Sequence, residues 1–204
     1  AISYRRLRNF KGSLSISVGV QEMVRSDMGS SGVAFTLDTE SGYKGSIFIT
    51  SSYGLGEGIV QGTVNPDEFY VFKRALEKND FPIIKKNLGE KAKKMIFADN
   101  NLPGKSVKYV KVPKKEANEF SLTNSEIIEL AKYAKTIEDH YKVPMDIEWA
   151  KDEKDEKIYI LQARPETVQS KVSNYFERFT LKEKGELIVS GKSVGQKIGT
   201  GTAK

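Results

Sequence analysis

Cysteine is absent from this 204-residue sequence, and histidine occurs only once. A chain without cysteine forms neither disulfides nor thiolate metal sites, and this composition fits a cytoplasmic location. The single histidine, His140, falls off the apolar face of a predicted helix, so we expect no phosphoryl relay through histidine within this chain. No apolar run is long enough to cross a bilayer, and no membrane partner is therefore expected.

The formal net charge is +6, spread over many lysines rather than gathered in one block. Nucleic acid, a membrane surface or a polyphosphate ligand would each suit such a surface. The lysine-rich stretch 84–98 is predicted as a basic helix, which is the best support for a nucleic-acid-binding module. Against nucleic acid, the aromatic residues are expected inside strands rather than on a basic surface. The lysines in question are Lys85, Lys86, Lys91, Lys93 and Lys94.

Four polar residues near the end of the chain form the most informative pattern. Asp146 and Glu148 lie two residues apart in an alternating stretch, which puts both carboxylates on one face of a strand, about 7 Å apart. Gln162 and Arg164 have the same spacing in the next stretch. The wholly charged segment 151–157 between them is typical of an exposed turn. A hairpin centred there would place Glu148 opposite Gln162 and Asp146 opposite Arg164.

The chemistry of these four groups suits a nucleotide. Carboxylate oxygens are ligands for Mg²⁺, and the arginine fork binds phosphate. The alternative interpretation is a surface hairpin with cross-strand ion pairs, which contribute little stability. The nucleotide interpretation depends on the register, because a slip by one residue sends one pair to the opposite face. Strict alternation would also put Ile158 and Ile160 on the same face as Gln162 and Arg164.

Alternating apolar residues and turn-forming residues predict an α+β fold with a mostly antiparallel sheet flanked by helices. One helix is predicted after the capping-box pattern that runs from Thr123 to Glu126. The second helix is the basic stretch 84–98, in which Gly89 weakens the helical pattern. Strands are predicted at 14–24, 33–37, 46–50, 68–72, 107–112, 144–150 and 158–164.

Two further segments could contact a ligand, and each has an ordinary alternative. The glycine-rich stretch 53–62 lets a ligand approach the backbone closely, with Glu57 placed to accept from a ribose hydroxyl. It could equally be a bulged turn, and the lysine and hydroxyl residue of a phosphate loop do not follow it. The segment 18–24 could hold an adenine ring with Met23 against it. Without further context, it reads as an ordinary strand with solvated polar residues.

Taken together and in this order, several segments resemble phosphoenolpyruvate synthase, also called pyruvate, water dikinase. The resemblance covers most of residues 1–168, and its strength lies in the number of ordered motifs rather than in any single one. The segments that carry it are 18–24, 25–36, 54–57, 65–70, 146–149 and 162–165.

The resemblance implies an ATP-grasp fold, of which residues 1–168 would be the C-terminal part. Residues 169–204 would be a linker and the truncated start of the phosphohistidine (swivelling) domain. ATP and Mg²⁺ are the implied ligands. On the adenine side the family's residues fall on Gln21 with Glu22, Met23 and Val24, and Glu57 matches the loop glutamate. The acidic metal-binding pair falls on Asp146 and Glu148, and the phosphate-contacting catalytic pair on Gln162 and Arg164.

The intact enzymes of this family are implied to convert ATP, pyruvate and water to phosphoenolpyruvate, AMP and phosphate through a phosphohistidine. The expected partners are therefore other domains of the same protein: the N-terminal ATP-grasp subdomain, the phosphohistidine domain and the pyruvate-binding barrel. The ends of the chain read as cut, so we expect a fragment that is inactive alone. Related dikinases and rifamycin phosphotransferases share the acidic pair and the Gln-x-Arg pattern, and they remain the alternative.

Overall fold

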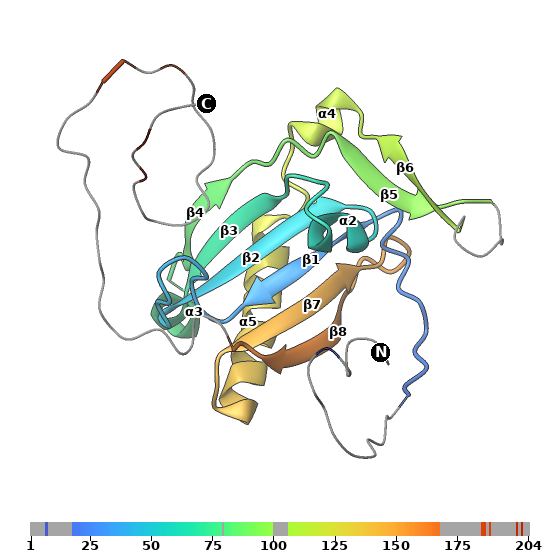
Figure 1. The fold of residues 1–204 in the computed structure, drawn as a ribbon. Helices are drawn as coiled ribbons and strands as arrows, with labels where there is room; N and C mark the ends of the chain where they lie inside the picture. Colours follow the sequence, from blue (N-terminus) through green and yellow to red (C-terminus); the bar gives the residue numbers. More distant parts are fainter. Residues whose placement is uncertain are drawn as a thin grey trace.

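The computed structural model describes residues 18–78, 80–99 and 106–167, and the isolated positions Leu7, Gly185, Glu186, Ile188, Gly199 and Gly201. Apart from these isolated positions, the predicted linker and following domain at 169–204 lie outside the described residues. A six-stranded antiparallel sheet with strand order β4-β3-β2-β1-β7-β8 dominates the described fold, and a long helix packs against one face of it (Figure 1). The predicted α+β class with a mostly antiparallel sheet is confirmed.

The bounds of the elements are as follows. The six-stranded sheet contains β1 Ser30–Phe35, β2 Ser46–Tyr53, β3 Asp67–Phe72, β4 Ile83–Asn87, β7 Met145–Lys151 and β8 Ile158–Pro165. A separate two-stranded sheet pairs β5 Lys93–Phe97 with β6 Val107–Lys111. The helices are α2 Glu57–Val60, α3 Lys73–Lys78, α4 Lys114–Ala117 and α5 Asn124–Tyr141.

The hydrophobic core lies between the sheet and α5. In the central strands, alternate residues such as Ala34, Ile49 and Ile147 are fully buried, because successive side chains of a strand point to opposite faces. The helix contributes residues at helical spacing, including Ile127 and Leu130. The sheet therefore has a face covered by α5, which we call the covered face, and a second face, which we call the open face.

The capping box at the start of α5 is confirmed. The Thr123 side chain accepts from the backbone N–H of Glu126, and the Glu126 carboxylate accepts from the Thr123 N–H at 2.7 Å. Two of the unpaired N–H groups at the helix start are satisfied in this way. The helix ends at Lys142, whose left-handed conformation closes the last turn through Glu138 O.

The predicted helix at 84–98 is wrong, since this stretch contains β4 and β5. Gly89 interrupts it, and a Cβ on Gly89 would lie 2.3 Å from the Pro66 backbone. The Gly89 N–H donates to the Asp67 carboxylate at 2.8 Å, so this loop is fixed against β3. Lysines spaced along a strand and along a helix give similar sequence patterns, and here tertiary contacts decide between the two.

The predicted strand at 14–24 is also corrected where the structure describes it. Residues 18–25 form no ladder, and Val18 and Val20 are 85% and 96% exposed. Residues 14–17 lie outside the described residues. An apolar alternation predicts a strand only if a neighbouring strand pairs with it, and none pairs with residues 18–25. The segment instead runs on past Arg25, whose backbone N–H donates to Asp152 at 2.9 Å.

The remaining strands were predicted in type, with shifts of a few residues at their ends. The strand predicted at 107–112 exists as β6, but it belongs to the two-stranded sheet rather than to the main sheet. The two sheets meet where Gly54 pairs with Met95. The helices α2, α3 and α4 were missed because four to six residues are too few to show a helical period.

Candidate functional site

The β7–β8 hairpin has the predicted register. Asp146 pairs with Arg164 and Glu148 pairs with Gln162, so all four polar residues lie on one face of the sheet. This is the open face, since the intervening Ile147 points into the core. This register was required by the sequence analysis for the four side chains to share one surface, and the structure has it.

A β-bulge in this hairpin corrects the expectation of strict alternation. The register shifts between Glu148 and Trp149, and Leu161 is the extra residue on β8. Ile160 then pairs with Trp149, and Ile158 is buried in the core at 7% exposure. The isoleucines and the Gln-x-Arg pair consequently occupy opposite faces. Because of the bulge, β8 buries Ile158 in the core at one end and places Gln162 and Arg164 on the open face at the other.

Arg164 and Asp146 form an ion pair across the hairpin. The guanidinium Nε and Nη2 donate to the Asp146 Oδ2 at 2.8 Å and 2.7 Å. The hydrogen bond to Asp146 and the charges of Asp146 and Glu148 raise the pKa of Arg164 above its usual value. The Arg164 side chain is 63% exposed while that of Asp146 is 13% exposed. An anion arriving from solvent can therefore reach the guanidinium without unfolding anything.

Glu148 differs from its neighbour because its carboxylate has no hydrogen bond or salt bridge to any residue in the described parts of the chain. It is half-buried, opposite Val33 of β1 on the open face. Its charge interacts with that of Arg164, but burial has removed part of the hydration of this carboxylate without a hydrogen bond to replace it. It is therefore available to a cation or to a hydrogen-bond donor from a ligand.

A pocket of about 490 Å³ lies next to Glu148. The walls include apolar side chains from four segments, namely Met23, Leu55, Val60, Trp149 and Leu161. Such a mixture of apolar walls with a few polar groups is typical of sites for small organic ligands. The pocket also brings together six of the residues that the sequence analysis singled out, Gln21, Glu22, Met23, Val24, Glu57 and Glu148.

Asp146, Gln162 and Arg164 do not line this pocket. They lie beside it along the hairpin, since Asp146 is two residues from Glu148 on β7. The arrangement gives an apolar pocket that leads towards a polar patch. A ligand with a flat apolar end and an anionic end would match this arrangement, with the apolar end in the pocket and the anionic end beside the hairpin.

Glu57 begins α2 and is exposed. The Glu57 Oε1 accepts from the Gln61 side chain at 2.7 Å, one turn later. The glycine loop before it is fixed, because the Leu55 N–H donates to Met95 O at 2.9 Å and Ser31 donates to Gly54 O at 2.6 Å. The loop is thus held at the edge of the pocket, where Glu57 faces the same space as Glu148.

The chemistry of the donors fits a hard divalent cation that is shared with a ligand. Within the described residues, no three acidic, histidine or cysteine side chains come together as a metal site. Mg²⁺ does not need such a cage, because it keeps several waters and is usually held by one or two carboxylates plus phosphate oxygens. Asp146 and Glu148 supply two carboxylates on one face; Glu148 lines the pocket, and Asp146 lies beside it in contact with Arg164.

Leu161, Trp149 and Val60 are pocket residues that the sequence analysis missed. Trp149 belongs to the buried core and also lines the pocket. Leu161 enters the pocket through the bulge. An apolar residue in an alternating strand gives no signal that distinguishes the core from a ligand pocket. Of the five lysines in the basic stretch, Lys91 is fully buried against Asp67 and so does not contribute to a basic surface.

None of the helices in the described residues combines the length and the apolar character that crossing a bilayer needs. Comparison with protein families matches residues 1–183 to the pyruvate phosphate dikinase, AMP/ATP-binding domain. Over its whole length the chain is 54% identical to a phosphoenolpyruvate synthase of Pseudomonas aeruginosa and 50% identical to one of Escherichia coli. In both comparisons the match covers 26% of the relative's length.

A more distant relative carries a similar name. A probable phosphoenolpyruvate synthase of Pyrococcus abyssi is 37% identical over 98% of this chain and 24% of its own length. The chain thus spans about a quarter of the length of the curated relatives that it matches.

Proposed function

The chain belongs to the family of pyruvate phosphate dikinase AMP/ATP-binding domains, and from that premise we propose that it binds MgATP on the open face of its sheet, as part of a phosphoenolpyruvate synthase. The purine and ribose occupy the pocket between residues 21–24, the glycine loop and β7. The phosphates lie along the β7–β8 hairpin. The observation that carries this proposal is the register that puts Asp146, Glu148, Gln162 and Arg164 on one surface beside the pocket.

Each residue has a defined role in this proposal. Gln21 and the backbone of residues 22–24 contact the adenine edge, and Glu57 accepts from the ribose. Asp146 and Glu148 would hold Mg²⁺, which when bound would neutralise charge on the phosphoryl group during its transfer.

The hairpin supplies the cationic contact. Arg164 exchanges its contact with Asp146 for a phosphate oxygen and stabilises the charge that develops there. Gln162 orients the same group through its amide. Because Arg164 is exposed and already aligned by Asp146, this exchange needs a side-chain rotation and no movement of the backbone.

In the whole protein the proposed reaction converts ATP, pyruvate and water to phosphoenolpyruvate, AMP and phosphate through a phosphohistidine. Residues 1–168 are then the C-terminal part of the ATP-grasp domain, and residues 169–204 lead into the phosphohistidine domain. The other ATP-grasp subdomain, the phosphohistidine domain and the pyruvate-binding barrel are the proposed partners, and the cytoplasm is the proposed compartment. A related dikinase or rifamycin phosphotransferase would use the same hairpin with a different acceptor. The synthase is preferred because the relatives described above carry that name.

Calorimetric titration of MgATP into the purified chain tests the nucleotide site. Glu148→Gln keeps the size of the side chain and removes the charge, and we expect it to weaken MgATP binding about tenfold, the loss of one charged contact. Glu129→Gln is the matched control, because Glu129 lies on α5 at the covered side of the sheet. Equal affinities for the two variants would contradict the assignment.

An assay for phosphoenolpyruvate formation tests whether these 204 residues are active alone. We expect no phosphoenolpyruvate formation by the 204 residues alone, because the relay histidine and the pyruvate site belong to the proposed partner domains. Detection of phosphoenolpyruvate made by the purified chain would refute this expectation.

A further inference from the structure

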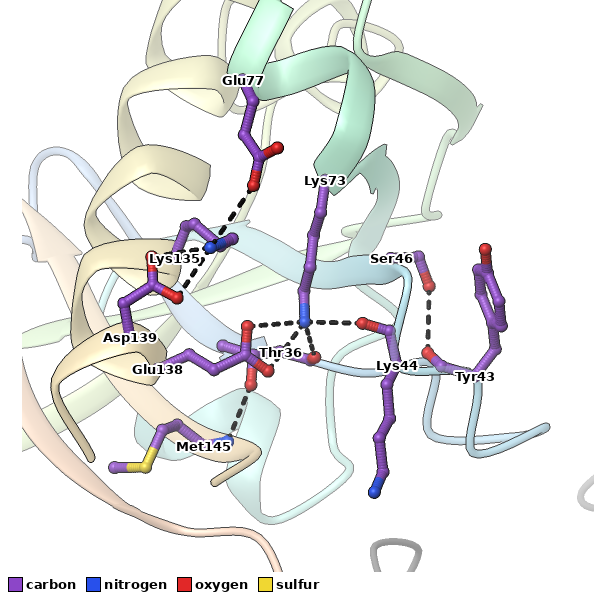
Figure 2. A network of polar contacts seen from close by, with 10 residues as sticks. All are labelled: Thr36, Tyr43, Lys44, Ser46, Lys73, Glu77, Lys135, Glu138, Asp139 and Met145. Atoms are coloured by element: carbon purple, nitrogen blue, oxygen red, sulfur yellow. Dashed lines mark hydrogen bonds and ion pairs between the residues drawn. The ribbon is translucent and has the colours of Figure 1, made fainter. Parts of the chain in front are cut away.

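A buried lysine lies at the point where β1, α3 and α5 meet. Lys73, the first residue of α3, has its Nζ within hydrogen-bond distance of Thr36 O at 2.6 Å, Lys44 O at 2.7 Å and the Glu138 carboxylate at 2.8 Å (Figure 2). An ammonium group has three donors, and these three acceptors use all of them. The lysine therefore ties the end of β1, the following loop and the last turn of α5 to one point.

Thr36 passes this constraint on to β7. The Thr36 N–H donates to Met145 O at 3.0 Å. The Thr36 Oγ1 accepts from the Met145 N–H at 2.8 Å (Figure 2). Thr36 and Met145 thus exchange two hydrogen bonds just beyond the last β1–β7 pair. That last pair joins Phe35 and Asp146. The contact held by Lys73 is consequently one residue away from the carboxylate at the start of the polar face.

The chain reaches this position through a short connection, in which Pro144 O accepts from the Glu166 N–H at 2.8 Å. Between the end of α5 at Tyr141 and Met145 there are only Lys142, Val143 and Pro144, and Lys142 is in the left-handed conformation. Pro144 has no N–H to donate. The start of β7 is therefore held mainly by the paired strands and by the double contact between Met145 and Thr36.

Stability alone does not explain a charged group at this place. Burial lowers the pKa of Lys73, and the hydrogen bond and charge of Glu138 oppose that shift. A buried ion pair can often be replaced by apolar side chains of similar volume without loss of stability. What an apolar side chain cannot provide is a directed contact with two backbone carbonyls and a carboxylate at once.

We propose that Lys73 is a positioning residue for Asp146, acting through Thr36 and the start of β7. This proposal rests on the proposed function, in which Asp146 holds the cation on the phosphates. Loss of the ammonium lets the first residues of β7 move relative to β1, so that the Asp146 carboxylate no longer meets Arg164 and the cation in one geometry. Outer partners of metal ligands commonly have effects of this kind.

Lys73→Met removes the ammonium and keeps an unbranched apolar side chain of similar length. We expect it to weaken the Mg²⁺-dependent part of ATP binding by about 10-fold to 100-fold, the size typical of groups that orient metal ligands. Binding of AMP without Mg²⁺ should change by less than about twofold, since the adenine pocket is built from other segments. A parallel loss of both affinities would show a general structural effect and would overturn the proposal.

Amide hydrogen exchange at Met145 provides a readout that needs no nucleotide. We expect Lys73→Met to speed exchange of the Met145 N–H, whose acceptor is Thr36 Oγ1, while the amides in the middle of α5 keep their protection. Unchanged exchange at Met145 would overturn the proposal. If the wild-type chain failed to bind MgATP, the proposed function would fail, and the exchange at Met145 would still decide whether Lys73 positions β7.

Two further variants complete the experiment. Thr36→Val removes only the Oγ1 acceptor and should weaken Mg²⁺-dependent binding in the same direction, which keeps the test valid if Lys73→Met does not fold. Lys135→Met is the matched control, because Lys135 pairs with Glu77 and Asp139 on the surface and has no contact with Thr36 (Figure 2). An effect of Lys135→Met equal to that of Lys73→Met would contradict the proposed role.

Discussion

The two faces of the six-stranded sheet use charge in different ways. On the covered side, Lys91 and Asp67 have no exposed surface, and the charges of Lys73 and Glu138 are similarly paired. On the open face, Arg164 is largely exposed, and the Glu148 carboxylate interacts with its charge but forms no hydrogen bond or salt bridge within the described residues. The difference is that the charges of the covered side are buried in ion pairs that stabilise the fold, whereas those of the open face are accessible, and we propose that they bind a ligand. Substitutions should therefore separate into effects on folding and effects on binding.

The largest effect is expected on the covered side, at Asp67. Its carboxylate accepts from the Gly89 N–H and from the Ser121 N–H, each at 2.8 Å, and from the Lys91 ammonium. Asp67→Ala would leave that ammonium buried without a counter-charge, so we expect a loss of about 3–5 kcal/mol in the free energy of unfolding. Denaturant unfolding of the wild-type chain and of Asp67→Ala measures this loss in the free energy of unfolding.

Glu40→Ala is the control for Asp67→Ala, since Glu40 is exposed in the loop after β1. It should change the free energy of unfolding by less than about 0.5 kcal/mol. A loss below about 1 kcal/mol for Asp67→Ala would mean that the covered ion pair does not hold β3 to its loop.

Gly32 tests how closely the strands pack beneath the pocket. A Cβ at this position would lie 1.9 Å from Thr50 O and 3.1 Å from the Trp149 ring. Gly32→Ala should therefore lower the free energy of unfolding by about 1–3 kcal/mol, the range for overpacked interiors. Gly19→Ala, with no atom within 4 Å of its added Cβ, should have little effect. Equal stabilities of the two variants would show that β1 and β2 can separate without cost.

On the open face, substitutions should affect ligand binding more than the free energy of unfolding. Arg164→Ala should weaken MgATP binding by about 1.5–3 kcal/mol, the range for a hydrogen bond to a charged group. The same change should alter the free energy of unfolding by less than about 1 kcal/mol, because the ion pair with Asp146 is exposed on the arginine side. His140→Ala serves as the control for binding. Equal binding losses in the two variants would contradict the difference between the two faces.

A smaller effect is expected from pH at Glu126, which joins α5 to β7 through Lys151 at 2.6 Å. Burial acts to raise the pKa of Glu126, but hydrogen bonds from Lys151 and Thr123 outweigh it and hold the pKa below its usual value. A lowered pKa in the folded state stabilises the fold above the pKa of the unfolded state. That contribution is lost as the pH falls through the pKa of the folded state.

Denaturant unfolding measured between about pH 6 and pH 3 tests this sign. The wild-type chain should lose stability more steeply than Glu126→Gln as the pH falls over this range, because the glutamine has no proton to bind. Parallel curves for the two proteins would show that the Glu126 charge contributes nothing to the fold.

Local signals explain which parts of the molecule could be predicted from the sequence. The capping box at Thr123 and the alternation around Ile147 lie within a few residues, and both elements exist where they were predicted. The hairpin register followed from one charged turn and two matched pairs. These features depend on neighbours in the sequence, so no distant contact was needed to infer them.

Distant contacts explain the errors. Residues 18–25 carry a strand pattern but have no strand beside them, and the stretch 84–98 is divided by a loop fixed to Asp67. The bulge at Leu161 follows from packing, because Ile158 and Ile160 lie on the core side while Gln162 faces the open side. The pocket depends on all of these arrangements at once. Six of its residues could be identified individually through a resemblance, but its shape and its apolar walls at Val60, Trp149 and Leu161 could not.

The most direct test of the account is a titration of the isotope-labelled chain with MgATP, followed by NMR. The account predicts that the side-chain signals of Arg164 and Gln162 and the amides of Asp146 and Glu148 shift most, while the exposed side of α5 does not respond. Saturating shifts confined to α5, or to the lysines of β5 and β6, with none at the hairpin would contradict a nucleotide site on the open face.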